Sequence, residues 1–188
     1  MAEYYLISQL PSLDGISDNM PLPLDKETFL NLCGNNLKES SFEELKKATI
    51  KPLKNYEKSS SSLLNEWNEA EKSLRLVLAA VRAEKMKITF DGPNVENNPN
   101  AKTLIKVAEA ATEMESPMEA ERFLNNYRLD FLETLRPMDS FSEEYLFYYS
   151  LKLDLLSRIR KFDKETGRDS YKNIYNSIMN AEKREETL

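Results

Sequence analysis

A regular alternation of apolar and polar positions runs from residue 61 to residue 87. Apolar side chains recur there at steps of four and three residues, in the order Leu63, Trp67, Ala70, Leu74, Val77 and Val81. An α-helix has roughly 3.6 residues per turn, so this spacing places these side chains on one face. The pattern predicts the longest helix of the protein in this segment, with its apolar face packed against a neighbouring helix and Trp67 in the core.

Residue types that begin and end helices divide the rest of the chain. Asp25 suits the start of a short helix, and Gly34 is placed to end it. Ser41 with Glu44 three residues later is a capping box, which predicts a second short helix that stops before Pro52. Further predicted helices begin at Asn100, Ser116 and Ser140, and a last one carries Tyr171, Ile174, Tyr175 and Ile178.

The first 24 residues carry an apolar and aromatic cluster between Tyr4 and Leu10. At this length periodicity does not distinguish a strand from a turn of helix, so a short extended segment and a one-turn segment both remain open. The whole pattern predicts an all-α fold of six or seven helices in an irregular bundle. It also predicts a single helical domain over residues 1–188, in which residues 1–58 form short helices and loops and residues 59–188 form the main bundle.

The segment from residue 143 to residue 160 is apolar around much of its circumference, with Tyr148 and Tyr149 in its middle. A helix that is apolar over so wide an arc is buried on several sides or presents a face to another chain. Arg158 and Arg160 stand at its C-terminal end, where the helix dipole favours cations and where arginine suits desolvated contacts. We therefore predict that Arg158, Arg160, Tyr148 and Tyr149 bind a partner protein.

Charge and composition narrow the range of partners. The formal net charge of -6 disfavours nucleic acid, whose phosphates require a basic face, and anionic membrane surfaces. No stretch approaches the roughly 18 consecutive apolar residues of a membrane helix, and the N-terminus lacks the layout of a signal peptide. Cys33, the only cysteine, has no partner for an internal disulfide. These features predict a cytoplasmic protein that binds no nucleic acid and does not insert into the membrane.

The chain contains no histidine. This absence removes the usual general base near neutral pH, every nucleophile paired with histidine, and most zinc and non-haem iron sites. The 4 glycines cannot assemble a phosphate-binding loop. Acid pairs such as Glu66 and Glu69 leave a carboxylate-based, metal-dependent hydrolase as an alternative, although solvated helix faces commonly carry such pairs. The sequence predicts no enzymatic activity, no catalytic residues, no cofactor and no metal site.

Residues 141–167, FSEEYLFYYSLKLDLLSRIRKFDKETG, resemble the late helix of the C-subunit family of V-type and archaeal-type rotary ATPases. That helix carries a comparable apolar and aromatic run, and Lys152, Asp154, Ile159, Arg160 and Gly167 occupy similar places here. The segment WNEAEKSLRLVLAAVRAEKM also resembles part of that family. Together with YYLISQLPSL and SPMEAERFLNNYRLDFLETL, the chain is most similar to an uncharacterised bacterial family encoded among V-type ATPase genes.

This resemblance implies a helical, non-catalytic protein of a rotary ATPase. Members of the C-subunit family cap the membrane rotor on its cytoplasmic side and receive the central stalk, so the implied partners are other V-type ATPase subunits. The implied role is rotor coupling or assembly, at a cytoplasmic location peripheral to the membrane. This chain is much shorter than a full member of that family, which leaves a reduced rotor component and an accessory factor both open. A cytoplasmic helical adaptor or scaffold unrelated to ATPases remains an alternative.

Overall fold

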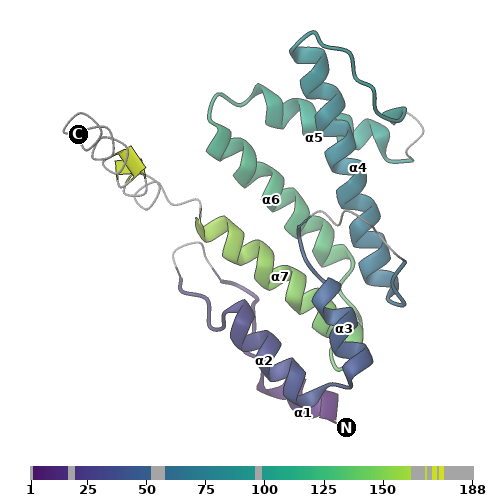
Figure 1. The fold of residues 1–188 in the computed structure, drawn as a ribbon, viewed down its shortest axis with the longest axis vertical. Coiled ribbons are helices and arrows are strands. Elements are labelled where there is room, and N and C mark those ends of the chain that lie inside the picture. Colours follow the sequence, from purple (N-terminus) through teal and green to yellow (C-terminus); the bar gives the residue numbers. More distant parts are fainter. Residues whose placement is uncertain are drawn as a thin grey trace, which may run out of the picture.

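The computed structural model describes residues 2–16, 20–51, 58–95, 99–161, 168, 171–172 and 174–175. Seven α-helices run through residues 2–161 of this described part, which contains no strand, so the all-α prediction is confirmed (Figure 1). The helices are α1 (Ala2–Gln9), α2 (Lys26–Asn36), α3 (Glu39–Lys47), α4 (Ser62–Lys85), α5 (Ala101–Glu113), α6 (Pro117–Thr134) and α7 (Glu143–Lys161). None of the described helices is long and apolar enough to cross a membrane.

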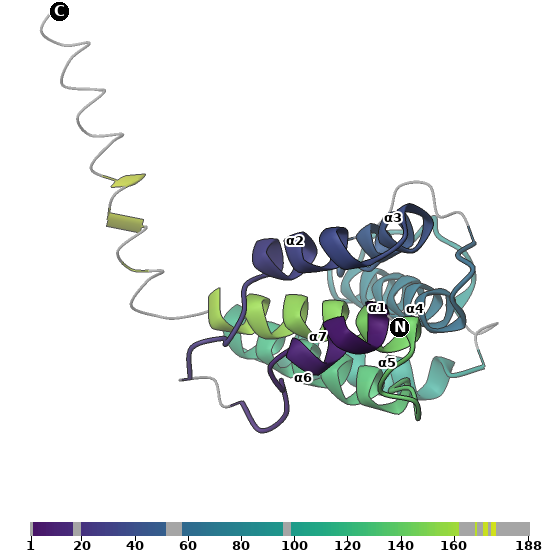
Figure 2. The same cartoon turned by 90° about the horizontal axis from the view of Figure 1, so that it is seen from below.

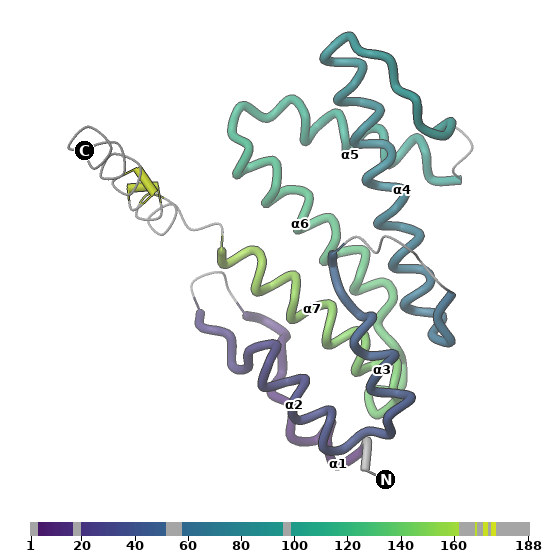
Figure 3. The backbone as a smooth tube through the Cα atoms, viewed as in Figure 1, coloured from purple at the N-terminus to yellow at the C-terminus, as the bar shows by residue number. Residues whose placement is uncertain are grey.

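Helix α4 confirms the strongest sequence pattern. It is the longest described helix, and its first turn is capped by Ser61, whose hydroxyl accepts a hydrogen bond from the Leu64 N–H at 3.1 Å. The predicted face is buried at Trp67, Leu74 and Val77, with Trp67 only 1% exposed. Beyond α4, residues 87–95 turn back alongside this helix, as the tube in Figure 3 shows, and α5 packs against α4.

The start of α2 was predicted correctly, but its end was not. The Asp25 carboxylate accepts a hydrogen bond from the Thr28 N–H at 2.7 Å, which is the expected N-cap. The helix then continues past Gly34 to Asn36. The ring of Phe42 in α3 lies so close to Gly34 that an added Cβ would stand 3.1 Å from the nearest ring carbon. Gly34 therefore permits close packing of α3 on α2 and does not end the helix.

The capping box predicted at Ser41 is also wrong. Helix α3 begins at Glu39, so Ser41 lies inside its first turn. Its hydroxyl donates instead to the Glu143 carboxylate at 2.8 Å, across to the start of α7. Glu44 accepts hydrogen bonds from Ser59 and from the Ser60 N–H at 3.0 Å. Both members of the supposed box therefore make tertiary contacts.

Three further helix starts were predicted. Helix α5 begins directly after Asn100, as expected, although the Asn100 side chain makes no capping hydrogen bond. Ser116 caps α6, because its hydroxyl accepts a hydrogen bond from the Glu119 N–H at 3.4 Å. Helix α7 begins three residues after Ser140, and it is the hydroxyl of Ser142 that accepts a hydrogen bond from the Tyr145 N–H at 3.3 Å. The prediction of Ser140 as the cap is therefore wrong by two residues.

Predictions were also made for the first and the last segment of the chain. The N-terminal segment that was expected to be extended or one turn long is the eight-residue helix α1. In the last predicted helix, Tyr171, Ile174 and Tyr175 are helical and exposed. Ile178 lies outside the described residues. The aromatic rings of Tyr171 and Tyr175 stack with their centroids 6.2 Å apart.

The helices enclose two hydrophobic cores. The first core joins α1, α2 and α3 to the start of α4, the end of α6 and most of α7. The second lies between the middle of α4, α5 and the first half of α6. Helix α7 lies between α2 on one side and α6 on the other (Figure 2). Helices α4 and α6 therefore contribute to both cores. The short N-terminal helices share the first core with α7, which carries the residues predicted to bind a partner.

Cys33 lies in the first core and is fully buried. Burial raises the pKa of its thiol to about 12, although nearby Lys26 opposes this shift. Because the thiolate is the reactive form, we expect no labelling by a disulfide reagent at pH 8 in the native protein and one equivalent after unfolding in urea. Rapid labelling without denaturant would contradict the buried position.

Candidate functional site

A basic cleft opens where the C-terminal half of α7 meets the start of α2, the connection after α3 and the middle of α4. Its volume is about 480 Å³, and its lining consists of Lys26, Thr49, Ile50, Lys51, Arg75, Asp154, Ser157, Arg158 and Lys161. Five of these nine side chains are cationic and one is acidic, in a chain whose formal net charge is -6. This concentration of positive charge distinguishes the cleft from the average surface.

The floor of the cleft is an ion pair between Lys26 and Asp154. The Lys26 ammonium lies 3.1 Å from the Asp154 carboxylate and donates hydrogen bonds to the Ser150 hydroxyl at 2.6 Å and to the Ala48 carbonyl at 3.3 Å. Burial lowers the pKa of Lys26 and raises that of Asp154, and the attraction between the two groups opposes both shifts. The pair therefore fixes α2, the end of α3 and α7 in place beneath the cleft.

Two arginines form the walls, and each is held by a neighbour. Arg75 donates to Glu71 at 2.8 Å and to the Ile50 carbonyl at 2.9 Å. Arg158 donates to Glu121 of α6 at 2.8 Å. The arginine side chains remain 35% and 32% exposed, respectively. Both guanidinium groups are thus oriented by contacts within the chain while part of each stays accessible from solvent.

Two lysines stand at the rim of the cleft. Lys51 and Lys161 are both exposed, and within the described residues neither ammonium forms a salt bridge. Both residues line the same cleft as the partly exposed guanidinium groups of the two arginines. Charge-assisted hydrogen bonds from ammonium and guanidinium groups are strongest with carboxylates and phosphates. The arrangement therefore suits an anionic group rather than a cation.

The structure separates the residues that the sequence grouped as partner-binding. Arg158 lines the cleft, whereas the Arg160 guanidinium donates to the Met20 carbonyl at 2.8 Å and does not line it. Tyr148 and Tyr149 are 1% and 2% exposed. Their hydroxyls donate to Glu133 at 2.7 Å and to the Pro11 carbonyl at 2.9 Å. The prediction that these tyrosines contact a partner is corrected: their rings fill the core of this chain.

The cleft residues that come from α7 form a helical pattern that the sequence analysis did not identify. Asp154, Ser157, Arg158 and Lys161 follow one another at steps of three, one and three residues, so they share one face of α7. Lys26, Lys51 and Arg75 come from three other segments, and no local pattern connects them. Among the described residues, no group of three or more acidic or cysteine side chains is placed to hold a metal ion.

The structure is thus that of an all-α protein with a basic cleft. The chain belongs to the DUF2764 family of proteins of unknown function, whose model matches residues 89–182, half of the 188 residues. No match to the chain is found among curated proteins or among solved structures. The matched segment contains α5, α6 and α7, and so includes the part of the cleft that α7 contributes.

Proposed function

We propose that this protein is a non-catalytic component or accessory factor of a V-type ATPase, similar to the C-subunit family, which acts in rotor coupling or assembly by binding another ATPase component through the basic cleft. The observation that carries the proposal is the set of five cations in one cleft of an acidic chain. Two of them, Lys51 and Lys161, form no salt bridge among the described residues.

The electrostatics of the cleft favour an acidic segment of a partner. A chain with a net charge of -6 repels acidic proteins in general. An acidic partner is therefore attracted only if its carboxylates contact the cations of this cleft directly. The C-terminal end of α7 carries Arg158 and Lys161, where the helix dipole favours cations. Because Arg75 and Arg158 are already oriented by Glu71 and Glu121, less side-chain freedom is lost when a partner binds.

The resemblance of residues 141–167 to the late helix of the C-subunit family supports V-type ATPase subunits as the partners. Within that stretch, Lys152 and Asp154 serve two separate contacts. Lys152 lies 2.6 Å from Asp14 and 2.7 Å from Glu133, whereas Asp154 pairs with Lys26 in the cleft floor. The Lys-x-Asp pair that carries the resemblance therefore attaches two N-terminal segments to α7. Partners in the rotor or central stalk remain the proposal.

Reversing the two rim lysines tests the cleft most directly. We expect Lys51→Glu/Lys161→Glu to reduce co-purification of V-type ATPase subunits with the tagged protein from its native host by about tenfold, equivalent to ~1.4 kcal/mol of binding free energy. The lysines are preferable to Arg158, because a carboxylate at position 158 would face Glu121. The matched control is Lys102→Glu/Lys106→Glu, which makes the same charge change at exposed positions of α5.

The outcomes separate the partner from the site. If the wild-type protein retains no ATPase subunits, the ATPase assignment is wrong, and an unrelated set of retained proteins would favour the adaptor alternative. Circular dichroism checks that the cleft variant is folded. If the folded variant retains ATPase subunits as well as the wild type does, the ATPase is the partner but the cleft is not the binding site.

A further inference from the structure

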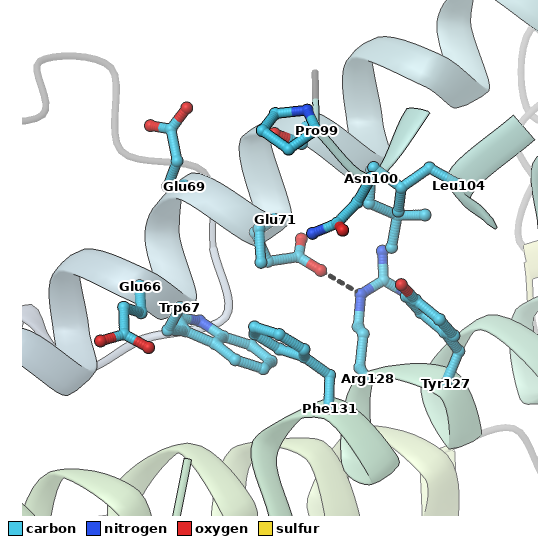
Figure 4. A pocket seen from close by; sticks show the side chains of 13 residues that line it. Glu66, Trp67, Glu69, Glu71, Pro99, Asn100, Leu104, Tyr127, Arg128 and Phe131 are labelled. Atoms are coloured by element: carbon cyan, nitrogen blue, oxygen red, sulfur yellow. Dashed lines mark hydrogen bonds and ion pairs between the residues drawn. The ribbon is translucent and has the colours of Figure 1, made fainter. Parts of the chain in front are cut away.

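A second cavity, separate from the basic cleft, lies between α4, the start of α5 and α6 (Figure 4). Its volume is about 410 Å³. Leu74 and Leu104 form part of an apolar wall, and Trp67, Tyr127 and Phe131 supply aromatic rings. The rings of Trp67 and Phe131 lie with their centroids 6.4 Å apart and their planes tilted by 30°. A cavity of this size and lining matches those that hold small organic ligands with an apolar body.

Arg128 brings a guanidinium group into this largely apolar lining. Its side chain is only 7% exposed and extends from α6 toward Glu71 and Asn100 (Figure 4). Nε donates to the Glu71 carboxylate and Nη1 donates to Asn125 Oδ1 at 3.4 Å, whereas no acceptor for Nη2 is found within the described residues. In that part of the chain the fully enclosed polar side-chain atoms without a partner are Trp67 Nε1 and Asn125 Nδ2. Nη2 is not one of them, so it stays accessible, and the cavity is the open space that Arg128 lines.

The carboxylate beside Arg128 is shared with a second arginine. Glu71 accepts hydrogen bonds from Arg128 through Oε1 and from Arg75 through Oε2, the latter at 2.8 Å. One negative charge therefore serves two guanidinium groups. Glu66 and Glu69 also line the cavity, but both are exposed and their carboxylates point away from Arg128 (Figure 4). Exposed charges act weakly on a buried group, so a further carboxylate at Arg128 would complete the pairing that Glu71 divides.

We propose that this cavity binds a small carboxylic acid in its ionised form. Its carboxylate accepts hydrogen bonds from Nη2 of Arg128, and its aromatic or apolar body lies against the rings of Trp67 and Phe131. Hydrogen bonds between a guanidinium group and a carboxylate are about twice as strong as those between neutral groups, and a site screened from water strengthens them further. The site lies apart from the basic cleft, and it does not depend on the function proposed above.

Trp67 is the only tryptophan of the chain and lines the cavity, so its fluorescence reports on binding there. We expect the full-length protein to show a saturable fluorescence change with 3-phenylpropanoate, with a dissociation constant of roughly 1 mM or below. The uncharged 3-phenylpropanamide should bind about tenfold more weakly, and 3-phenylpropylamine more weakly still. The absence of a saturable change with all three probes would overturn the site. Equal affinity for the propanoate and for either of the other two would overturn the carboxylate preference.

Two variants test the guanidinium group and the cavity separately. Arg128→Lys keeps a cation beside Glu71 but lacks Nη2, so it should weaken binding of the propanoate about tenfold and that of the amide much less. Ala70→Phe fills the cavity from α4 and leaves the ion pair in place, so it should abolish binding of both probes. The control Ala79→Phe adds the same ring at an exposed position of α4 outside the cavity and should alter neither.

Circular dichroism checks that each variant is folded. Binding of the propanoate by folded Arg128→Lys at wild-type affinity would overturn the role of Arg128. Binding by Ala70→Phe at wild-type affinity would show that the probes bind elsewhere. Should Arg128→Lys fail to fold, Ala70→Phe and the order of the three probes on the wild type still decide the proposal, because neither measurement alters the ion pair.

Discussion

Replacing Trp67 with alanine is expected to lower the free energy of unfolding by about 3–5 kcal/mol, the usual cost of emptying a buried aromatic position. The side chain is 1% exposed and packs in the first core beside Phe131 of α6. Its removal leaves a void that joins the neighbouring cavity of about 410 Å³. Urea denaturation followed by circular dichroism measures the loss, since the variant has no tryptophan fluorescence.

The matched substitution is Trp67→Phe. It retains an aromatic ring against Phe131, and it removes an indole N–H that has no acceptor among the described residues. We therefore expect it to cost less than half of what Trp67→Ala costs, because volume is lost but no hydrogen bond is broken. A loss below about 1 kcal/mol for the alanine variant would mean that Trp67 is exposed in solution.

Substituting Arg128 with methionine should lower the free energy of unfolding by about 3–5 kcal/mol, the range found when one partner of a buried ion pair is removed. Arg128 is buried in α6, where it hydrogen-bonds to Glu71 of α4 and lies 3.4 Å from the Asn125 side-chain oxygen. The variant leaves Glu71 buried with only Arg75 beside it, at 2.8 Å. Because Arg75 still neutralises part of that charge, we expect the lower end of the range.

A double substitution separates lost charge pairing from lost packing. Glu71→Leu/Arg128→Met removes both charges and keeps apolar volume between α4 and α6, so it should be more stable than Arg128→Met alone. Glu71→Leu alone is the second single variant and completes the double-mutant cycle. Equal stability of the single Arg128 variant and the double variant would show that the unpaired carboxylate is not what destabilises the protein.

The fold was largely predictable because its longest helices obey local rules. The apolar steps between Leu63 and Val81 and the capping serine at position 116 each act within a few residues, and both appear where expected. The predicted helix end at Gly34 and the predicted capping box at Ser41 were wrong because each residue contacts another segment. Phe42 packs on the glycine, and Glu143 accepts the hydrogen bond of the serine. Tertiary contacts replace the local role that their residue types suggest.

The candidate site was predictable only in one residue. Arg158 was chosen for its place at the end of a helix, and it does line the cleft. Arg160 is two residues away and therefore projects from another side of the helix, where it bonds the Met20 carbonyl. The remaining cations reach the cleft from α2, the α3–α4 connection, α4 and the last residue of α7. Their meeting depends on how the helices pack, which periodicity along one segment does not encode.

Helix α4 takes part in both hydrophobic cores, with Leu63, Leu64 and Trp67 in the first and Leu74, Val77 and Leu78 in the second. Neither core is complete without this helix. The family match begins at residue 89, beyond the end of α4. An isolated fragment cut at the family boundary would expose the apolar faces of α5, α6 and α7 that α4 covers, and would be prone to aggregation rather than to independent folding.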